Sequence, residues 1–431
     1  MKLRLLSFVI AAVVCIPWPL CAQSNAPATQ QHDHLRFVVI VTRHGVRSPT
    51  GKFDLLNQYS AQPWPRWNLR DADLSPHGFH LMELMGKYDR ALLAEQGLLA
   101  PSGCDDAARI RIVADSDQRT RETGRALASG LAPGCTIPVQ ALPEGTPDAL
   151  FHPIEAGLGP VDRERATAAL VGRIGNHPAE IAEAYRAPLE ALDQLLARCP
   201  KNKTCQPRHS LFEIDAAVTP GKSDHLVDLR SPLALASTMT ENFLLEYAEG
   251  MDTAQVGWGL VDAQKLRALL ALHVAQEDLG ARTEPVARAQ ASNLLFHLLR
   301  SVEQAATEHS AAGALTRIDD RLLILSGHDT NLANIAGALH LNWIIDGRRD
   351  DTPPGGALVF ELWQKEGAAE VRTYYVAQTL EQMRHATPLT LSAPPDRVPV
   401  FLPSCGRADE TCSLDGFRTA LMQAIDTSVV R

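Results

Sequence analysis

Three segments of the chain share one pattern, in which a short β-type run is followed by a polar cluster and then by a helix-like pattern. The runs are Phe37 to Val41, Arg109 to Val113 and Arg321 to Leu325. Runs that are apolar almost without interruption are typical of strands buried on both faces of a parallel sheet. Because ligands gather beyond the carboxyl ends of such strands, we expect the three polar clusters to face one crevice.

The character of the chain changes between about residues 151 and 290. Alanine- and leucine-rich helical patterns dominate there, as in Ile181 to Ala197, Pro232 to Ala248 and Ala263 to Glu277, and strand signals are nearly absent. This change predicts an α-helical cap domain, residues 151–290, that is inserted into another domain.

Two further strands are predicted nearer to the C-terminus, at Ala357 to Trp363 and Val371 to Val376, after a turn rich in Pro and Gly. Strand signals on both sides of the helical segment indicate one α/β domain formed by residues 33–150 and 291–431. The predicted fold class is therefore α/β, with a largely parallel central sheet and an inserted helical cap.

The first polar cluster places two guanidiniums around a histidine, as Arg43, His44 and Arg47. No acidic residue lies between Phe37 and Lys52, so we expect an external anion to balance the charges, and the planar fork of arginine matches a phosphate group. Adjacent cations disfavour protonation of His44, which keeps the imidazole nucleophilic. The cluster predicts attack of His44 on phosphorus; a core histidine flanked by surface arginines is the alternative.

The third polar cluster contains His328 and Asp329. Asp329 begins a predicted helix, where by itself it would be an N-cap. Beside a bound phosphate dianion, however, like-charge repulsion favours the protonated carboxyl, which suits Asp329 to donate a proton to the departing alcohol. Activity is therefore expected to be greatest in acid.

Composition and missing motifs narrow the function. Of the 431 residues, 45% are hydrophobic and 21% charged, as in a folded globular protein, and the net charge of -9 argues against a nucleic-acid partner. The chain has no Walker phosphate loop, no G-x-S-x-G elbow and no H-E-x-x-H zinc helix. His77 and His80 have no further ligands nearby in the sequence, so no metal site is predicted.

Residues 1–22 have the pattern of an export signal. Lys2 and Arg4 precede an apolar run from Leu5 to Val14, which is too short to span a bilayer, and Ala22 marks a plausible cleavage point. A tethering helix is the alternative. The prediction is a periplasmic protein with no membrane association after signal cleavage.

Six cysteines remain after the predicted cleavage. An even number of cysteines in an exported chain predicts disulfides, and zinc is disfavoured because C-x₂-C spacing is missing. Closure between nearest neighbours is the simplest pairing: Cys104 with Cys135, Cys199 with Cys205, and Cys405 with Cys412.

Residues 43–50 (RHGVRSPT) together with residues 327–331 (GHDTN) resemble the histidine acid phosphatases, particularly the bacterial periplasmic phytase and glucose-1-phosphatase group. The resemblance extends from about residue 36 to residue 412. Further matching motifs are WPRW at 64–67, DQRTR at 117–121, GWG at 257–259, TPPGG at 352–356 and QTLEQMR at 378–384.

The resemblance implies that His44 forms a phosphohistidine intermediate and that Asp329 protonates the leaving oxygen. It implies that the phosphate is held by Arg43, Arg47, Arg119 and His328, with Thr50 close to the substrate. Arg119, rather than Arg121, aligns with the third phosphate-binding arginine of the family. A phosphoglycerate-mutase-like α/β domain with a helical cap, no metal and no other cofactor, and disulfides between nearest neighbours are also implied.

Three departures from the family bear on the substrate. Gly51 stands where phytases of this group usually carry Lys, with Lys52 one position later, Gln290 stands where a basic residue is expected, and Thr238 where Met is common. The loss of outer cations is expected to weaken binding of a hexakisphosphate relative to a monoester. Glu241 matches an acidic position of the cap and is a candidate for the pocket lining.

We therefore expect a monomeric, exported acid phosphatase that acts on a small-molecule phosphate ester. Phytate (inositol hexakisphosphate) is the favoured substrate, and a sugar phosphate, as in glucose-1-phosphatase, is the first alternative. The alternatives from other classes are a non-catalytic periplasmic anion-binding protein, which would have no need of both His44 and Asp329, and a mutase, against which export and disulfides count.

Overall fold

The computed structural model describes residues 33–202, 204–365 and 367–431. The predicted export signal, residues 1–22, lies outside the described residues. Within the described part of the chain, no helix combines the length and the apolar character that crossing a membrane requires.

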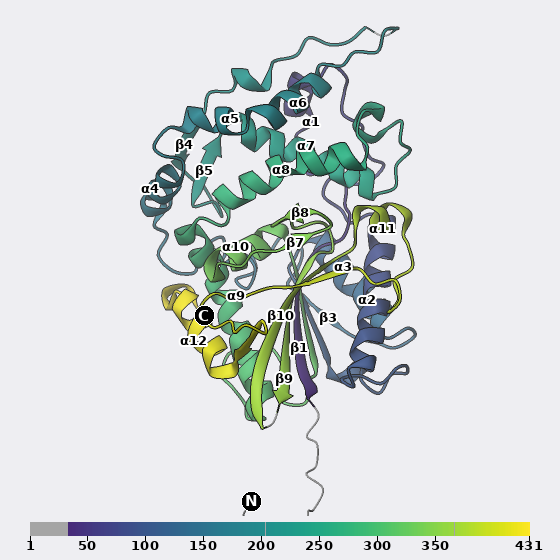
Figure 1. Cartoon of the computed structure of the whole chain (residues 1–431), viewed down its shortest axis with the longest axis vertical. Helices are drawn as coiled ribbons and strands as arrows, with labels where there is room; N and C mark the ends of the chain where they lie inside the picture. The colour runs from purple at the N-terminus through teal and green to yellow at the C-terminus, as the bar shows by residue number, and fades with distance from the viewer. Residues whose placement is uncertain (1–32, 203, 366) are drawn as a thin grey trace, which may run out of the picture. The chain divides into compact units, whose positions relative to one another are not determined.

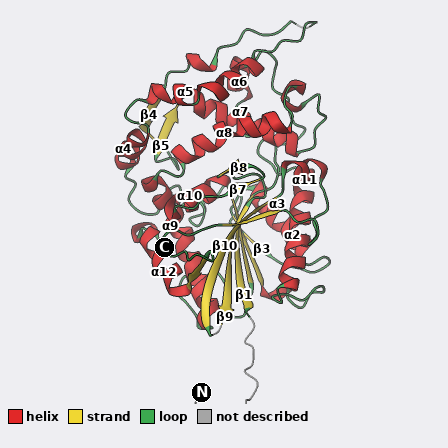
Figure 2. Ribbon diagram, in the orientation of Figure 1, coloured by secondary structure: helices red, strands yellow, loops and turns green. Residues whose placement is uncertain are grey.

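A central sheet organises the lower half of the view in Figures 1 and 2. Its strands are β1 (His34–Arg43), β2 (Ile110–Ala114), β3 (Val139–Gln140), β6 (Leu322–Gly327), β9 (Ala357–Lys365), β10 (Ala368–Ala377), β11 (Asp396–Pro399) and β12 (Thr411–Ser413). The order across the sheet is β11-β10-β9-β1-β6-β2-β3, and β12 pairs with β10. The three strands predicted from the first pattern, β1, β2 and β6, are neighbours, so their carboxyl ends meet.

The predicted α/β class is confirmed, but the sheet is mixed rather than largely parallel. β1, β6, β2 and β3 pair in parallel, whereas β9 pairs antiparallel with β1 and with β10, and β10 pairs antiparallel with β11 and β12. β10 begins three residues after β9 ends, and a parallel crossover needs a dozen residues or more. The short connection therefore forces a hairpin.

Helices cover both faces of the sheet because successive side chains of a strand point to opposite faces. Val38 and Ile40 of β1 pack with α2 (Pro76–Glu95) and α3 (Gln118–Leu131). Phe37, Val39 and Val41 pack on the other face with α9 (Glu284–Thr307), α10 (Asp329–Leu339) and α12 (Leu414–Ala424). Figure 1 shows the two helical layers on either side of the strands.

A second group of elements has its own apolar core. It consists of α4 (Arg163–Arg173), α5 (Ile181–Ala184), α6 (Arg186–Leu196), α7 (Pro232–Ala248), α8 (Ala263–Gly280) and the hairpin of β4 (Ala217–Pro220) with β5 (Val227–Arg230). α7 begins as the sequence predicts, because the Ser231 hydroxyl accepts a hydrogen bond from the Ala234 amide and Pro232 occupies the first turn. The β4–β5 hairpin was not predicted. The assignment of residues 151–290 to a separate domain stays a prediction.

The remaining short elements connect these parts. They include α1 (Phe53–Leu56), β7 (Ile344–Ile345), which pairs with β8 (Arg348–Arg349), and α11 (Leu380–His385), besides several short 3₁₀ turns.

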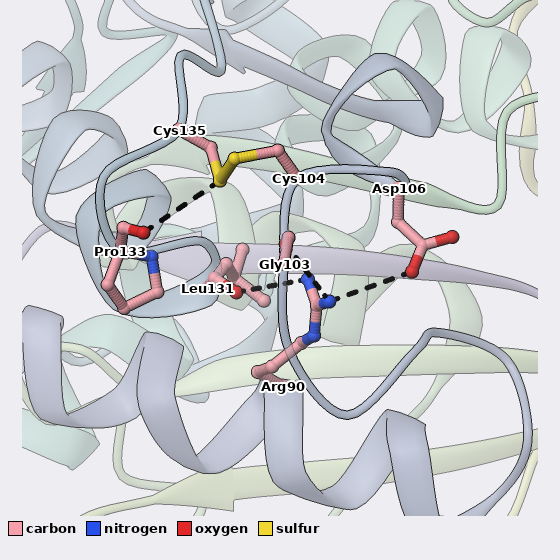
Figure 3. The surroundings of a disulfide bond; sticks show 7 residues. All are labelled: Arg90, Gly103, Cys104, Asp106, Leu131, Pro133 and Cys135. Carbon is pink, nitrogen blue, oxygen red and sulfur yellow. Dashed lines mark hydrogen bonds and ion pairs between the residues drawn. A yellow bond between two sulfur atoms is a disulfide. The ribbon is translucent and has the colours of Figure 1, made fainter.

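Three disulfides have the predicted pairing: Cys104 with Cys135, Cys199 with Cys205, and Cys405 with Cys412. Figure 3 shows the first of them beside the guanidinium of Arg90. Arg90 is buried and donates hydrogen bonds to the carbonyls of Ala100, Gly103 and Leu131. The disulfide and Arg90 thus hold the loop before β2 against the end of α3.

Candidate active site

The predicted polar clusters meet at the carboxyl ends of β1, β6 and β2. The His44 amide donates to the Gly327 carbonyl (2.9 Å) and the Asp115 amide donates to the Ser326 carbonyl (3.0 Å), which extends the pairing of the three strands into their loops. Arg43, His44, Arg119, His328 and Asp329 are brought together by this arrangement.

His44 is buried, with 2% of its surface exposed, and the hydrogen bond of its ring fixes the tautomer. Nδ1 lies 2.8 Å from the Gly45 carbonyl, and because a carbonyl oxygen only accepts, Nδ1 carries the proton and Nε2 carries the lone pair. Burial and the charges of Arg119, Arg43 and Arg47 hold the pKa of His44 well below its ordinary value. The imidazole is therefore neutral, with a nucleophilic Nε2.

Arg43 is partly neutralised by carboxylates from distant segments, which corrects the expectation that only an external anion balances the cluster. Its Nη2 pairs with Glu241 of α7 and lies 2.9 Å from Asp329 Oδ2, and its Nη1 donates to the Thr352 carbonyl (2.6 Å). Arg47 Nη2 lies 3.1 Å from Glu241 Oε1. These partners lie far along the chain from Arg43, so no local pattern indicates them.

The guanidiniums nevertheless keep free hydrogen-bonding capacity. Within the described ranges, the buried Nε atoms of Arg43, Arg47 and Arg119 have no hydrogen-bond partner. Buried donors are rarely left unpaired in native proteins, and an unpaired one calls for an explanation such as a bound ion. These three donors near His44 are available to an anion with several oxygens.

Asp329 is the first residue of α10, and the N-cap position belongs to His328. The Asp329 carboxylate accepts a hydrogen bond from the Thr330 amide (2.8 Å) and pairs with Arg43. Burial opposes its ionisation, but attraction to Arg43, His273 and Arg47 outweighs burial, so the pKa of Asp329 lies below its ordinary value. Without a ligand, this carboxyl is ionised rather than protonated.

A charged hydrogen-bond network orients His328. His328 Nε2 lies 2.7 Å from Asp115 Oδ2, and the same oxygen lies 3.2 Å from His152 Nε2. His152 Nδ1 lies 3.0 Å from Asp224 Oδ2, and Gln290 donates to the Asp224 carbonyl (2.6 Å). The network therefore reaches from the strand ends to the loop before β5.

The two histidines of this network differ in charge. Burial lowers the pKa of His152, but hydrogen bonds with Asp115 and Asp224 outweigh burial and raise the pKa to about 10. Burial and the charge of Arg119 outweigh the hydrogen bond to Asp115 and lower the pKa of His328. At neutral pH, His152 is an imidazolium, and His328 is neutral and donates its Nε2–H to Asp115.

Sequence reasoning missed the roles of Asp115, His152 and Asp224. Asp115 belongs to the second polar cluster, so the spacing after β2 was a usable signal. His152 and Asp224 are 72 residues apart and fall in a segment that was predicted to be helical. No local signal pairs these two residues.

Among the residues that the structure describes, two groups of side chains have the donor types of a metal site. Asp115, His152 and His328 form one, and His152, Glu155 and Asp224 form the other, with donor atoms within 4.8 Å of one another. His152 is common to both and is protonated between two carboxylates, so a metal would first have to displace that proton. His77, which together with His80 was the other candidate metal pair in the sequence, contacts the Met383 carbonyl.

A cavity of about 650 Å³ opens beside these residues. Its lining includes Arg47 and Asp329 of the site, Thr50, and Lys52, which follows the departing position Gly51. It also includes Thr238 and Gln290, at which the sequence departs from the phytase pattern. Four further acidic residues line the cavity: Asp224, Asp228, Glu241 and Glu277. The wall of the cavity therefore carries both signs of charge.

A neutral histidine ringed by guanidiniums at the strand ends of an α/β sheet defines a site suited to phosphoryl transfer. Residues 34–377 match the histidine phosphatase superfamily (branch 2). The chain belongs to this family and is a histidine acid phosphatase.

Relatives in the family include phosphatases of two kinds. The chain is 37% identical to phytase AppA of Escherichia coli (strain K12), over 94% of this chain and 95% of the relative. It is 27% identical to glucose-1-phosphatase of Providencia rettgeri, over 99% of this chain and 100% of the relative. The structure of Hafnia alvei phytase in complex with myo-inositol hexakis sulphate superposes with a TM-score of 0.82 at 33% identity, over 92% of this chain and 98% of that one.

Proposed function

We propose that this histidine acid phosphatase hydrolyses phytate through a covalent phosphohistidine on His44, with Asp329 as the general acid. The observation that carries the mechanism is the neutral His44, whose Nε2 lone pair is surrounded by three guanidiniums with unpaired Nε–H groups. We assign Arg43, Arg47 and Arg119 to binding of the scissile phosphate, and Thr50 to the substrate side of the cavity. We also assign His328 to the phosphate, because a bound dianion raises the pKa of His328 and lets Nδ1 gain a proton that it can donate while Nε2 stays bonded to Asp115.

The reaction proceeds in two displacements. His44 Nε2 attacks phosphorus, the bond from phosphorus to the ester oxygen breaks, and the departing oxygen takes a proton from Asp329. Water then attacks phosphorus, the bond to Nε2 breaks, and Asp329 accepts a proton from that water. Inorganic phosphate leaves, and His44 regains its lone pair.

Binding of substrate allows Asp329 to take up the proton that it needs. Without substrate, Arg43 keeps the Asp329 carboxyl ionised. A bound phosphate competes with this carboxyl for Arg43 and adds negative charge beside it. Both changes raise the pKa of Asp329, so that it takes up a proton from an acidic medium. Activity with an acid optimum follows.

Phytate is favoured as the substrate by the identity to phytases and by the cationic residues Arg47 and Lys52 at the cavity. A sugar phosphate is the second candidate, and the observation that favours it is the uncharged Gln290 in the cavity lining, where a basic residue is expected. Turnover of phytate and of glucose 1-phosphate by the same preparation separates the two. Faster hydrolysis of glucose 1-phosphate would make this chain a sugar-phosphate phosphatase.

We further infer that the chain is exported to the periplasm and acts there as a monomer, with residues 151–290 as a cap on the α/β domain. The three disulfides support export, since such bonds persist in oxidising compartments. N-terminal sequencing of the protein from the periplasmic fraction should begin after Ala22, and recovery from the membrane fraction would contradict cleavage. Light scattering of that protein should give the mass of one chain.

A further inference from the structure

A carboxylate to which the proposed mechanism gives no role lines the cavity. Glu277 lies in the last turn of α8, one turn after His273 on the same side of the helix, and both line the cavity. Among the residues that the structure describes, neither Glu277 Oε2 nor His273 Nε2 has a hydrogen-bond partner. His273 is 4% exposed, and its Nδ1 contacts Ser237 Oγ (3.0 Å).

The charges that face Glu277 come from several elements. Asp329 of α10 and Glu241 of α7 repel its ionised form, whereas His273 of α8 and Arg43 of β1 attract it. Asp228 and Arg230 of β5 line the same cavity. Glu241 and Asp329 are already paired with Arg43, but no ion pair joins Glu277 to a cation in the described part of the chain.

We propose that Glu277 selects substrates by charge: its carboxylate repels the additional phosphate groups of a polyphosphate ester and discriminates less against an ester with one phosphate. A single scissile phosphate is compensated by the guanidiniums at the strand ends. Each further phosphate has to enter the cavity, where Glu277 adds unpaired negative charge, and the repulsion grows with the charge of the ester. This inference rests on the proposed phosphomonoesterase function of the same site.

The selection depends on pH. Burial, together with Asp329 and Glu241, outweighs His273 and Arg43 and raises the pKa of Glu277 to about 7. The carboxyl is therefore neutral at pH 5 and ionised at pH 8. Since bound phosphates raise this pKa further, the change lies at or above neutrality. Polyphosphate esters are accepted in acid and disfavoured at alkaline pH.

A ligand of constant charge separates the titration of the protein from that of the substrate. Phytate gains charge between pH 5 and pH 8, but myo-inositol hexakissulfate keeps its charge. Its inhibition constant against p-nitrophenyl phosphate hydrolysis should rise roughly tenfold from pH 5 to pH 8 in the wild-type protein. In Glu277→Gln, which is uncharged at both pH values, the rise should be several-fold smaller than in the wild type, and the remaining rise belongs to Asp329, whose pKa also increases when an anion binds.

Glu95→Gln is the matched control, because it removes the same charge from an exposed position on α2 that does not line the cavity. This variant should retain the wild-type rise. For phytate and p-nitrophenyl phosphate as substrates at pH 8, the ratio of their kcat/KM values should increase roughly tenfold in Glu277→Gln and stay constant in Glu95→Gln.

The outcomes distinguish failure of the proposed function from failure of the proposed role of Glu277. A wild-type protein that cleaves no p-nitrophenyl phosphate contradicts the proposed function itself. A wild-type protein that cleaves it, but whose inhibition by the hexakissulfate is the same at pH 5 and pH 8, contradicts the role of Glu277 alone, and this measurement needs no variant to fold. An equal rise in wild type and Glu277→Gln assigns the titration to another group and equally overturns the inference.

Discussion

The residues at the strand ends and the α8 residues that line the cavity differ in which of their side-chain atoms lack a hydrogen-bond partner within the described part of the chain. Among the described residues, Arg43, Arg47 and Arg119 at the strand ends have buried donors without a hydrogen-bond partner, whereas Glu277 of α8 has a carboxylate oxygen without one. Unpaired donors attract an anion at any physiological pH, since guanidiniums do not lose their protons. The guanidiniums at the strand ends therefore keep their charge, whereas the Glu277 carboxyl on the helical wall of the cavity changes its charge near pH 7.

The largest effect is expected from the centre of the strand-end residues. His44→Ala should reduce turnover of p-nitrophenyl phosphate by at least about 10⁴-fold, because it removes the proposed nucleophile. Acid-quenched wild-type protein should carry radiolabelled phosphate on His44, and the variant should carry none. An unaltered far-ultraviolet circular dichroism spectrum would show that the variant is folded, and appreciable turnover by it would contradict covalent catalysis by His44.

The next effect tests the proton donor. Asp329→Asn should slow hydrolysis of an alkyl phosphate by about 10²- to 10³-fold, because the leaving alkoxide then departs without a proton. p-Nitrophenyl phosphate, with its good leaving group, should be affected much less. Comparison of kcat for the two esters at the same pH measures the difference, and equal slowing of both would assign the proton to another group.

A smaller effect is expected from the contact between Asp224 and His152, which links the strand ends to the loop before β5. Asp224→Asn removes one carboxylate from His152 and should lower the free energy of unfolding by about 2 kcal/mol near pH 5. The folded pKa of His152, about 10, exceeds its ordinary value of 6.5, so the stabilisation is complete below about 6.5 and disappears as the pH rises through 10. The pKa of Asp224 is lowered, so its contribution is lost in strong acid.

Denaturant unfolding at pH 5 and at pH 10 measures this dependence. The difference between wild type and Asp224→Asn should be present at pH 5 and much reduced at pH 10. Asp105→Asn, at an exposed position, serves as the control and should show little difference at either pH. A constant difference for Asp224→Asn would mean that the contact with charged His152 does not stabilise the fold.

The smallest effect is expected from an exposed lysine at the edge of the cavity. Lys52 is exposed and lines the cavity, and Lys52→Ala should raise KM for phytate roughly threefold while leaving p-nitrophenyl phosphate unchanged, because only the larger ester reaches it. Lys87→Ala on α2 is the matched control. An equal change for both substrates would place Lys52 at the scissile phosphate instead.

The meeting of the strand-end residues could be predicted from the sequence for a physical reason. Each strand is followed directly by its reactive cluster, so the apolar run of β1 and the cluster around His44 are read together in one short segment. The same holds for β6 with His328 and Asp329. Parallel pairing of neighbouring strands then brings these clusters together without any further information.

The remaining contacts depend on segments that are far apart in the chain. Arg43 and Glu241 are 198 residues apart, and their ion pair exists only after α7 has packed over the strand ends. The β4–β5 hairpin and the antiparallel half of the sheet escaped prediction for a similar reason, since the direction of pairing is decided by connections rather than by composition. The raised pKa of Glu277 could not be predicted from the sequence either, because it is set by burial and by Asp329 and Glu241 from other helices.

Each of the three disulfides joins cysteines that follow one another in the chain, with separations of 31, 6 and 7 residues. An oxidant that acts on the cysteines in order, as an unfolded chain emerges into an oxidising compartment, therefore forms the correct bonds without any rearrangement. Maturation of this protein should accordingly be insensitive to loss of a disulfide isomerase while remaining dependent on an oxidase.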